Sequence, residues 1–389
     1  MRIAHIIDNL NLLGGAQKMT LLFAQLATQN GIDFTVVSLE DKRPNITLKT
    51  ELEKTGARVV VFSAKTLLAT GRLARLVQFL RREKFDVIHT NLTYANIVGT
   101  TAGRLANTPV IAGLRNTKTQ SSRYHQLRFT LESLTLRHLA GALMAVGQAT
   151  AAAHQPRFNR KSIHVVPNAI TLPPLPSAAE RAALRAGLLA NPTRPLLVAV
   201  GRLTEQKGYA DLLEAVALVK RSHPAVALVI AGEGELRPEL TAHIERLGLA
   251  DHARLLGARN DVPALLAAGD IFVSSSRWEG LSNAILEAMA AGLPVVATRV
   301  NDTPHVLVEG TGLLVPPGDP PALAKALTQL LDQPARRELL GSAARAHVAH
   351  CHAPAAWFNQ LMQLYQSVQT GPARPVAAGY RTGRPVTED

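Results

Sequence analysis

The chain is poor in several features that mark specialised classes of protein. It contains 1 cysteine, Cys351, so no disulfide can form within the chain, and we expect a reducing compartment. Aromatic residues make up only 4% of the chain and form no base-stacking motif, which argues against nucleic acid as a partner. No run of about 18 apolar residues could span a bilayer, and the first residues turn polar too soon for a signal peptide. We therefore expect a cytoplasmic protein that is not integral to a membrane.

The chain also lacks any Asp-x-Asp pair, the arrangement that would hold a metal ion against a diphosphate. We therefore expect neither a metal nor a cofactor. What the chain does have is length and apolar content. Its 389 residues are long for one core, and 47% apolar residues are enough to bury two, so two domains are the natural expectation.

Short β-branched runs alternate with helical stretches, which predicts parallel sheets covered by helices on both faces. The pattern runs through residues 1–170, stops at a Pro-rich linker with a short helix over 171–195, and restarts over 196–353. Residues 354–369 predict a last helix, and the Pro-, Gly- and Arg-rich residues 370–389 predict a disordered tail. We therefore predict an α/β fold with two Rossmann-like, doubly wound domains that face each other across a cleft. Ligands of such sheets bind beyond the carboxyl ends of the strands.

The most informative segment covers residues 279–296 and carries Glu279 and Glu287, with seven residues between them. Ser282 predicts the N-cap of a helix over 283–291, so Glu279 precedes this helix and Glu287 lies one turn inside it. Free backbone N–H groups at a helix start can bind a phosphate. Acids on both sides of a phosphate suit a ligand with hydroxyl groups at both ends, such as a sugar nucleotide.

A second loop would supply positive charge. Gly201 follows an apolar run and lets the backbone approach a ligand closely. Arg202 can bind phosphate oxygens with two N–H groups, and Lys207 can act as a point charge beside them. Because no metal is predicted, these two cations and the helix start at residue 283 would have to neutralise a diphosphate.

With these two loops the chain resembles the retaining glycosyltransferases of family 4, which have the GT-B fold. The resemblance covers about residues 1–369, and it includes Gly14-Gly15-Ala16, residues 166–170, Gly232-Glu233-Gly234 and residues 312–319. It implies that Arg202, Lys207 and Glu279 are catalytic. The two cations would stabilise the leaving diphosphate, and Glu279 would contact hydroxyls of the transferred sugar.

The same resemblance implies a set of residues that bind the sugar-nucleotide donor. Gly15 would lie on a loop that closes over the phosphates, Glu287 would hold the ribose hydroxyls, and Arg259 would lie in the segment that reads the nucleobase. The backbone of residues 280–282 would hold the distal phosphate. The full set is Gly15, Gly201, Arg259, Gly280, Leu281, Ser282 and Glu287.

The acceptor side departs from the family pattern. Many relatives have a His after the fifth strand of the first domain, and this chain has Arg115 and Asn116 there. Arg115 stays protonated and cannot be a general base, but it could bind an acceptor phosphate or the leaving group. His89 is predicted to end a strand that faces the cleft, although a structural role is the commoner one for such a His. Residues 301–305 also differ, because relatives usually carry Gly-Gly and a Glu there.

The net charge of +13 lies entirely in the first half of the chain. Residues 1–170 hold 22 Lys and Arg against 9 Asp and Glu, whereas residues 171–389 hold 20 of each. The densest basic segment, residues 115–137, predicts an amphipathic helix with a basic face for anionic lipid. A solvated helix packed on its own domain is an equally good alternative. The charge favours a glycan or lipid-linked acceptor at the inner membrane face, in surface polysaccharide or lipopolysaccharide synthesis.

We therefore predict an enzyme of the hexosyltransferase class, which moves a sugar from a nucleoside-diphosphate-sugar to an acceptor hydroxyl with retention of configuration. Two alternatives remain open. One is a sugar-nucleotide epimerase or a phosphorylase of the same fold. The other is a non-catalytic, membrane-associated protein that binds nucleotides.

Overall fold

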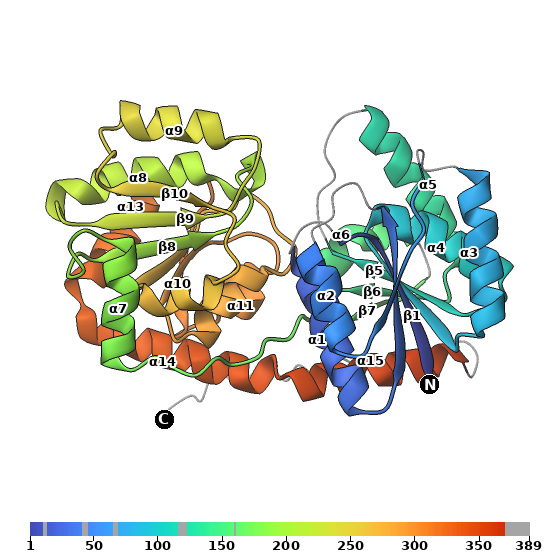
Figure 1. The fold of residues 1–389 in the computed structure, drawn as a ribbon. Coiled ribbons are helices and arrows are strands. Elements are labelled where there is room, and N and C mark those ends of the chain that lie inside the picture. Colours follow the sequence, from blue (N-terminus) through green and yellow to red (C-terminus); the bar gives the residue numbers. More distant parts are fainter. Residues whose placement is uncertain (11–13, 41–45, 65–68, 116–122, 159–160, 370–389) are drawn as a thin grey trace, which may run out of the picture.

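The computed structural model describes residues 1–10, 14–40, 46–64, 69–115, 123–158 and 161–369. Two parallel sheets lie side by side, each covered by helices (Figure 1). This arrangement confirms the predicted α/β fold with two Rossmann-like units. The tail over residues 370–389 lies outside the described residues, so its predicted disorder stays a prediction.

The first sheet has the strand order β3-β2-β1-β4-β5-β6-β7, and each of its pairings is parallel. The order reverses direction between β1 and β4, which creates the crevice where ligands bind in such sheets. The strands are β1 (Arg2–Asn9), β2 (Asp33–Glu40), β3 (Arg58–Val61), β4 (Val87–Asn91), β5 (Val110–Leu114), β6 (Ala142–Ala145) and β7 (Ile163–Val165).

The second sheet repeats this plan with the order β10-β9-β8-β11-β12-β13, again with parallel pairings. Its direction reverses between β8 and β11, the two strands that lead into the loops singled out from the sequence. The strands are β8 (Leu196–Val200), β9 (Ala227–Ala231), β10 (Ala253–Gly257), β11 (Ile271–Ser274), β12 (Val295–Thr298) and β13 (Gly312–Val315).

Helices cover both faces of each sheet, because the parallel strands carry apolar side chains on both faces. The first unit contains α1 (Gly15–Gln29), α2 (Ile46–Lys54), α3 (Thr70–Glu83), α4 (Thr93–Leu105), α5 (Arg123–Leu139) and α6 (Gln148–Phe158). The second contains α7 (Ala178–Leu188), a 3-10 turn η1 (Glu205–Lys207), α8 (Tyr209–Ser222), α9 (Arg237–Arg246), α10 (Val262–Ala268), α11 (Asn283–Ala290), α12 (Thr303–Val306), α13 (Pro320–Asp332) and α14 (Pro334–Cys351).

The last helix, α15 (Pro354–Gln369), leaves the second unit and packs on the first. It shares one core with α1 and the first sheet (Figure 1, red). Trp357, Phe358 and Tyr365 of α15 surround Phe23 of α1, with ring centroids 5.3 to 6.1 Å from the Phe23 ring. Helix α15 therefore completes the hydrophobic core of the first unit.

Two predicted elements differ from the structure. Strand β4 continues to Asn91, which pairs with Gly113 of β5, so His89 lies inside the strand and does not end it. The predicted basic helix over residues 115–137 is wrong at Arg115, which directly follows β5 and lines a cavity inside the protein. Among the described residues, helix α5 begins at Arg123.

Candidate active site

Helix α11 follows β11, and the loop that leads into it contacts the loop after β8, where Arg277 N donates to the Gln206 carbonyl over 2.8 Å. Ser282 occupies the N-cap position, but its side chain makes no capping hydrogen bond, which differs from the prediction. The helix has apolar residues on nearly all sides, with Ile285, Leu286 and Met289 at 1% exposure or less. The helix start is therefore held in place by packing, and its first N–H groups receive no bond from the Ser282 side chain.

Glu279 and Lys207, which the sequence places 72 residues apart, form an ion pair. The Glu279 side chain lies almost entirely inside the protein, at 8% exposure. Ser276 Oγ donates to its Oε1 atom over 2.8 Å, and Gln206 Nε2 donates to its Oε2 atom over 3.2 Å. A buried carboxylate needs such partners, and Glu279 is held in one orientation by three of them.

Arg202 lies at the rim of this cluster and stays exposed. Its Nη2 atom donates to Gln206 Oε1 over 3.3 Å, so Gln206 bridges Arg202 and Glu279. Gly201 is needed for a different reason than ligand approach alone. A Cβ atom there would lie 2.8 Å from Tyr209 Oη and 2.9 Å from Lys207 Cε, so the missing side chain makes room for Lys207.

A second helix start meets α11 from the other unit. Asn283, the first residue of α11, donates from Nδ2 to the carbonyl of Gly15, the first residue of α1, over 3.1 Å. Asn168 Nδ2 donates to Asn283 Oδ1 over 2.6 Å. Beside them, a Cβ on Gly280 would lie 2.0 Å from the carbonyl oxygen of Arg115. The two units therefore touch through backbone at the predicted phosphate loop, and only glycine fits at position 280.

Glu287 also contacts the first unit. Its Oε1 atom lies 2.5 Å from Lys18 Nζ of α1, so the partner that a carboxylate in this helix requires is a lysine of the other unit. The pair lines a cavity of about 190 Å³ between α1, α11 and Thr171. The ribose contact that the resemblance implies for Glu287 would have to replace or share this lysine.

Arg259 is bonded within its own loop. Its Nε atom donates to Asp261 Oδ1 over 2.7 Å, and a second ion-pair contact joins Nη2 to the same carboxylate. This pair raises the pKa of Arg259 and lowers that of Asp261. The positive charge of the Arg259 guanidinium is therefore already balanced by Asp261, and its predicted contact with a nucleobase stays a prediction.

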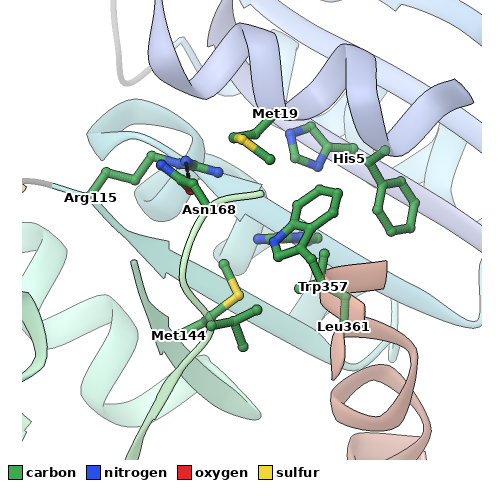
Figure 2. A pocket seen from close by; sticks show the side chains of 10 residues that line it. His5, Met19, Arg115, Met144, Asn168, Trp357 and Leu361 are labelled. Carbon is green, nitrogen blue, oxygen red and sulfur yellow. Dashed lines mark hydrogen bonds between the residues drawn. The ribbon is translucent and has the colours of Figure 1, made fainter. Parts of the chain in front are cut away.

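His89 belongs to a buried polar cluster in the first unit, together with His5 (labelled in Figure 2) and Asn91. Its Nδ1 atom lies 2.7 Å from Tyr365 Oη, and its Nε2 atom lies 3.3 Å from Asn91 Nδ2. Burial and the neighbouring His5 lower the pKa of His89. Both ring nitrogens have partners inside the protein, so this placement favours the structural role over contact with an acceptor.

Arg115 lies next to this cluster and connects it with the interface. Its Nε atom donates to Asn91 Oδ1 over 2.7 Å. Its Nη1 atom donates to Asn168 Oδ1 over 3.3 Å, and this second bond is dashed in Figure 2. Both partners are neutral amides, and burial lowers the pKa of Arg115 to about 10. Because Asn168 also holds Asn283, hydrogen bonds run from Arg115 to the start of α11. Asn116 lies outside the described residues.

The described residues contain neither a metal-binding cluster nor a membrane-spanning helix. No group of three or more His, Cys, Asp or Glu side chains in this part of the chain could hold a metal ion. No described helix is both long and apolar enough to cross a membrane.

Both units match known families. Residues 13–172 match the family described as Glycosyltransferase Family 4, and residues 180–347 match the family described as Glycosyl transferases group 1. The chain belongs to glycosyltransferase family 4. The two matched segments correspond to the two sheets, and both helix starts that meet at Asn283 lie within them.

Two relatives of this family 4 enzyme are named for transfer to a lipid-linked sugar and for lipopolysaccharide core synthesis. One relative is an Escherichia coli UDP-Gal:alpha-D-GlcNAc-diphosphoundecaprenol alpha-1,3-galactosyltransferase. The two sequences are 27% identical, and the match covers 85% of this chain and 88% of the relative. A second relative is the lipopolysaccharide core biosynthesis glycosyltransferase LpsE of Rhizobium meliloti. The two sequences are 39% identical, and the match covers 35% of this chain and 39% of the relative. The crystal structure of Anabaena HepE in complex with UDP has a TM-score of 0.81 and 25% identity, over 94% of this chain and 100% of that one.

Sequence reasoning missed the polar residues that hold the two acids and the start of α11 in place. They share no motif, because each is defined by a contact across the structure, and a lone Lys, Gln, Ser or Asn in a loop or helix carries no signal by itself. Only Asn283 could have been singled out, since it opens the helix that carries Glu287. The residues are Lys18, Asn168, Gln206, Ser276, Asn283 and Asn301.

Proposed function

We propose that this glycosyltransferase moves a sugar from a UDP-sugar to a lipid-linked or otherwise anionic glycan, with retention of configuration. The observation that carries the proposal is the meeting of two helix starts, α1 and α11, at Asn283, four residues along the chain from Glu279 of the Lys207–Glu279 pair. Two sets of N–H groups and a lysine favour a diphosphate, and a fixed carboxylate next to them favours sugar hydroxyls.

Breaking the bond between sugar and phosphate builds negative charge on the departing diphosphate. The Lys207 ammonium would interact with this phosphate as well as with Glu279, and Arg202 at the rim would add a second cation. Removing one such stabilising group typically slows an enzyme by about 100- to 1,000-fold. Glu279 would stay bonded to Ser276 and Gln206 and receive the hydroxyls of the sugar.

The choice of UDP is supported by two relatives. The Anabaena protein HepE was crystallised with UDP, and the E. coli relative is named for UDP-Gal. Thermal unfolding with UDP, GDP and ADP would test the choice, since a ligand at 100 times its dissociation constant adds about 2.7 kcal/mol of stability. We expect a shift with UDP that is lost in Arg202→Ala. No shift with any nucleotide would contradict the donor site.

An acceptor held at an anionic membrane surface would explain why the excess charge of +13 lies in residues 1–170. Helix α5 exposes Leu127 at 68% and Leu134 at 50%, apolar side chains that could enter a lipid surface. Arg128 stacks on Tyr94, however, so α5 is less basic on its outer face than its sequence suggests. Co-sedimentation with liposomes tests the point, and equal binding to neutral and anionic lipid would contradict it.

Retention and turnover can be tested in one assay. Incubation with an α-linked UDP-sugar and a lipid-diphosphate-linked acceptor should give an α-linked product by NMR, and a β-linked product would exclude retention. An epimerase would change the donor without any acceptor. A phosphorylase would need inorganic phosphate, and a non-catalytic binding protein would leave the donor intact while still showing the thermal shift.

A further inference from the structure

Helix α6 of the first unit receives its N-terminal cap from the second unit. The carboxylate of Asp302 accepts hydrogen bonds from Ala149 N over 2.7 Å, from Thr150 N over 3.0 Å and from Thr150 Oγ1 over 2.8 Å. Asp302 has no exposed surface. A carboxylate at a helix start bonds free N–H groups and faces the positive end of the helix dipole, so this contact is favourable and directional.

Both partners of this contact are shaped for it. Gly147 immediately precedes α6 and has no side chain with which to cap it, and a Cβ there would lie 2.2 Å from the carboxyl carbon of Asp302. Asp302 itself stands at the N-cap position of its own helix α12, yet its side chain makes no bond there. The carboxylate therefore caps a helix of the other unit and leaves its own uncapped.

The neighbouring residue reaches the active site. Asn301 Oδ1 accepts a hydrogen bond of 3.0 Å from the backbone N–H of Glu279, the acid paired with Lys207. Asn301 has a φ of 42°, in the left-handed region that few side chains other than Asn tolerate. Two adjacent residues thus point in different directions, one to the other unit and one to the catalytic acid.

We propose that Asn301 and Asp302 couple closure of the two units to the position of Glu279. With the units together, Asp302 is fixed by three bonds to α6, and the fixed backbone holds Asn301 against Glu279. With the units apart, Asp302 and the start of α6 would both face water, and the segment would keep only its local backbone hydrogen bonds. Asp302 and Asn301 are positioning residues, and the role given to Glu279 rests on the proposed function.

The test begins with Asp302→Ala and a matched control, Asp319→Ala. Asp319 caps α13 by accepting from Ala322 N over 2.9 Å, within the second unit alone. Both variants lose one helix-capping carboxylate, but only the first loses a contact between units. Small-angle X-ray scattering with and without UDP should show compaction in the wild type and in Asp319→Ala, and a reduced compaction in Asp302→Ala. We expect kcat/KM for transfer to fall about tenfold in Asp302→Ala only.

A second variant separates the two halves of the proposal. Asn301→Gly keeps the backbone conformation, because glycine tolerates a positive φ, and removes only the bond to Glu279. It should compact with UDP like the wild type and still lose kcat. The coupling would be overturned if Asp302→Ala became as compact with UDP, and transferred sugar as fast, as Asp319→Ala. If the wild type turned over no donor, the proposed function would fail, while the scattering comparison would still decide the role of Asp302.

Discussion

Substituting Lys207 with methionine isolates the charge of the Lys207–Glu279 pair, because methionine keeps the length and apolar stem of lysine. The two side chains are 16% and 8% exposed, so the remaining Glu279 carboxylate would be left buried without its cation. Breaking one partner of a buried pair typically destabilises a protein by 3–5 kcal/mol. Glu279 keeps its bonds to Ser276 and Gln206, so we expect the lower end, about 3 kcal/mol.

For a unit of this size, about 3 kcal/mol corresponds to a fall in Tm of roughly 6–12 °C, which differential scanning calorimetry would resolve. The double variant Lys207→Met/Glu279→Gln should recover most of that loss, because no unpaired buried charge remains, while transfer activity stays absent. A loss below about 1 kcal/mol in Lys207→Met would refute the reasoning, since that is the behaviour of a solvent-screened surface pair.

Three further predictions concern Gly280, His5 and Glu287. Gly280→Ala places a Cβ 2.0 Å from the Arg115 carbonyl, so it should hold the units apart and lower transfer at least tenfold; an unchanged rate at saturating donor would show that the units need not meet there. Burial lowers the pKa of His5 to about 3, so His5 stays neutral when folded, and stability should fall as pH drops from about 6.5 toward 3. His5→Gln should flatten this fall by up to about 1.4 kcal/mol per pH unit, measured by urea unfolding at pH 7 and 4.5. Glu287→Gln should bind UDP and 2′-deoxy-UDP with equal affinity in calorimetry, whereas a wild type without preference between them would contradict a ribose contact.

The parts of the fold that follow a local rule could be predicted from the sequence. The α11 segment carries its own stop signal in Gly292 and Pro294, and the structure ends the helix at Ala290, one residue before the predicted end. The pairing of Lys207 with the 279–287 segment was also within reach. Both loops follow strands of one parallel sheet, and the carboxyl ends of such strands meet at one edge.

The parts that failed depend on contacts between distant segments. The predicted end of β4 at His89 was wrong because Thr90 and Asn91 continue to pair with β5, and pairing is a property of two strands. The density of basic residues over 115–137 predicts a helix that includes Arg115, whereas the structure places Arg115 directly after β5. Amide oxygens from Asn91 and Asn168 solvate it inside the protein, and neither could be paired with it from the sequence.

The return of α15 to the first unit has a consequence for synthesis on the ribosome. The first sheet is complete in sequence at Val165, but the apolar face that covers α1 also needs Trp357, Phe358 and Leu361, which are translated almost 200 residues later. Nascent domains usually fold in the order in which they emerge. Here the first unit can bury its core only after the second unit has been synthesised. A chain that stops before α15 would therefore leave an apolar, aggregation-prone surface exposed on a sheet whose strands are all present.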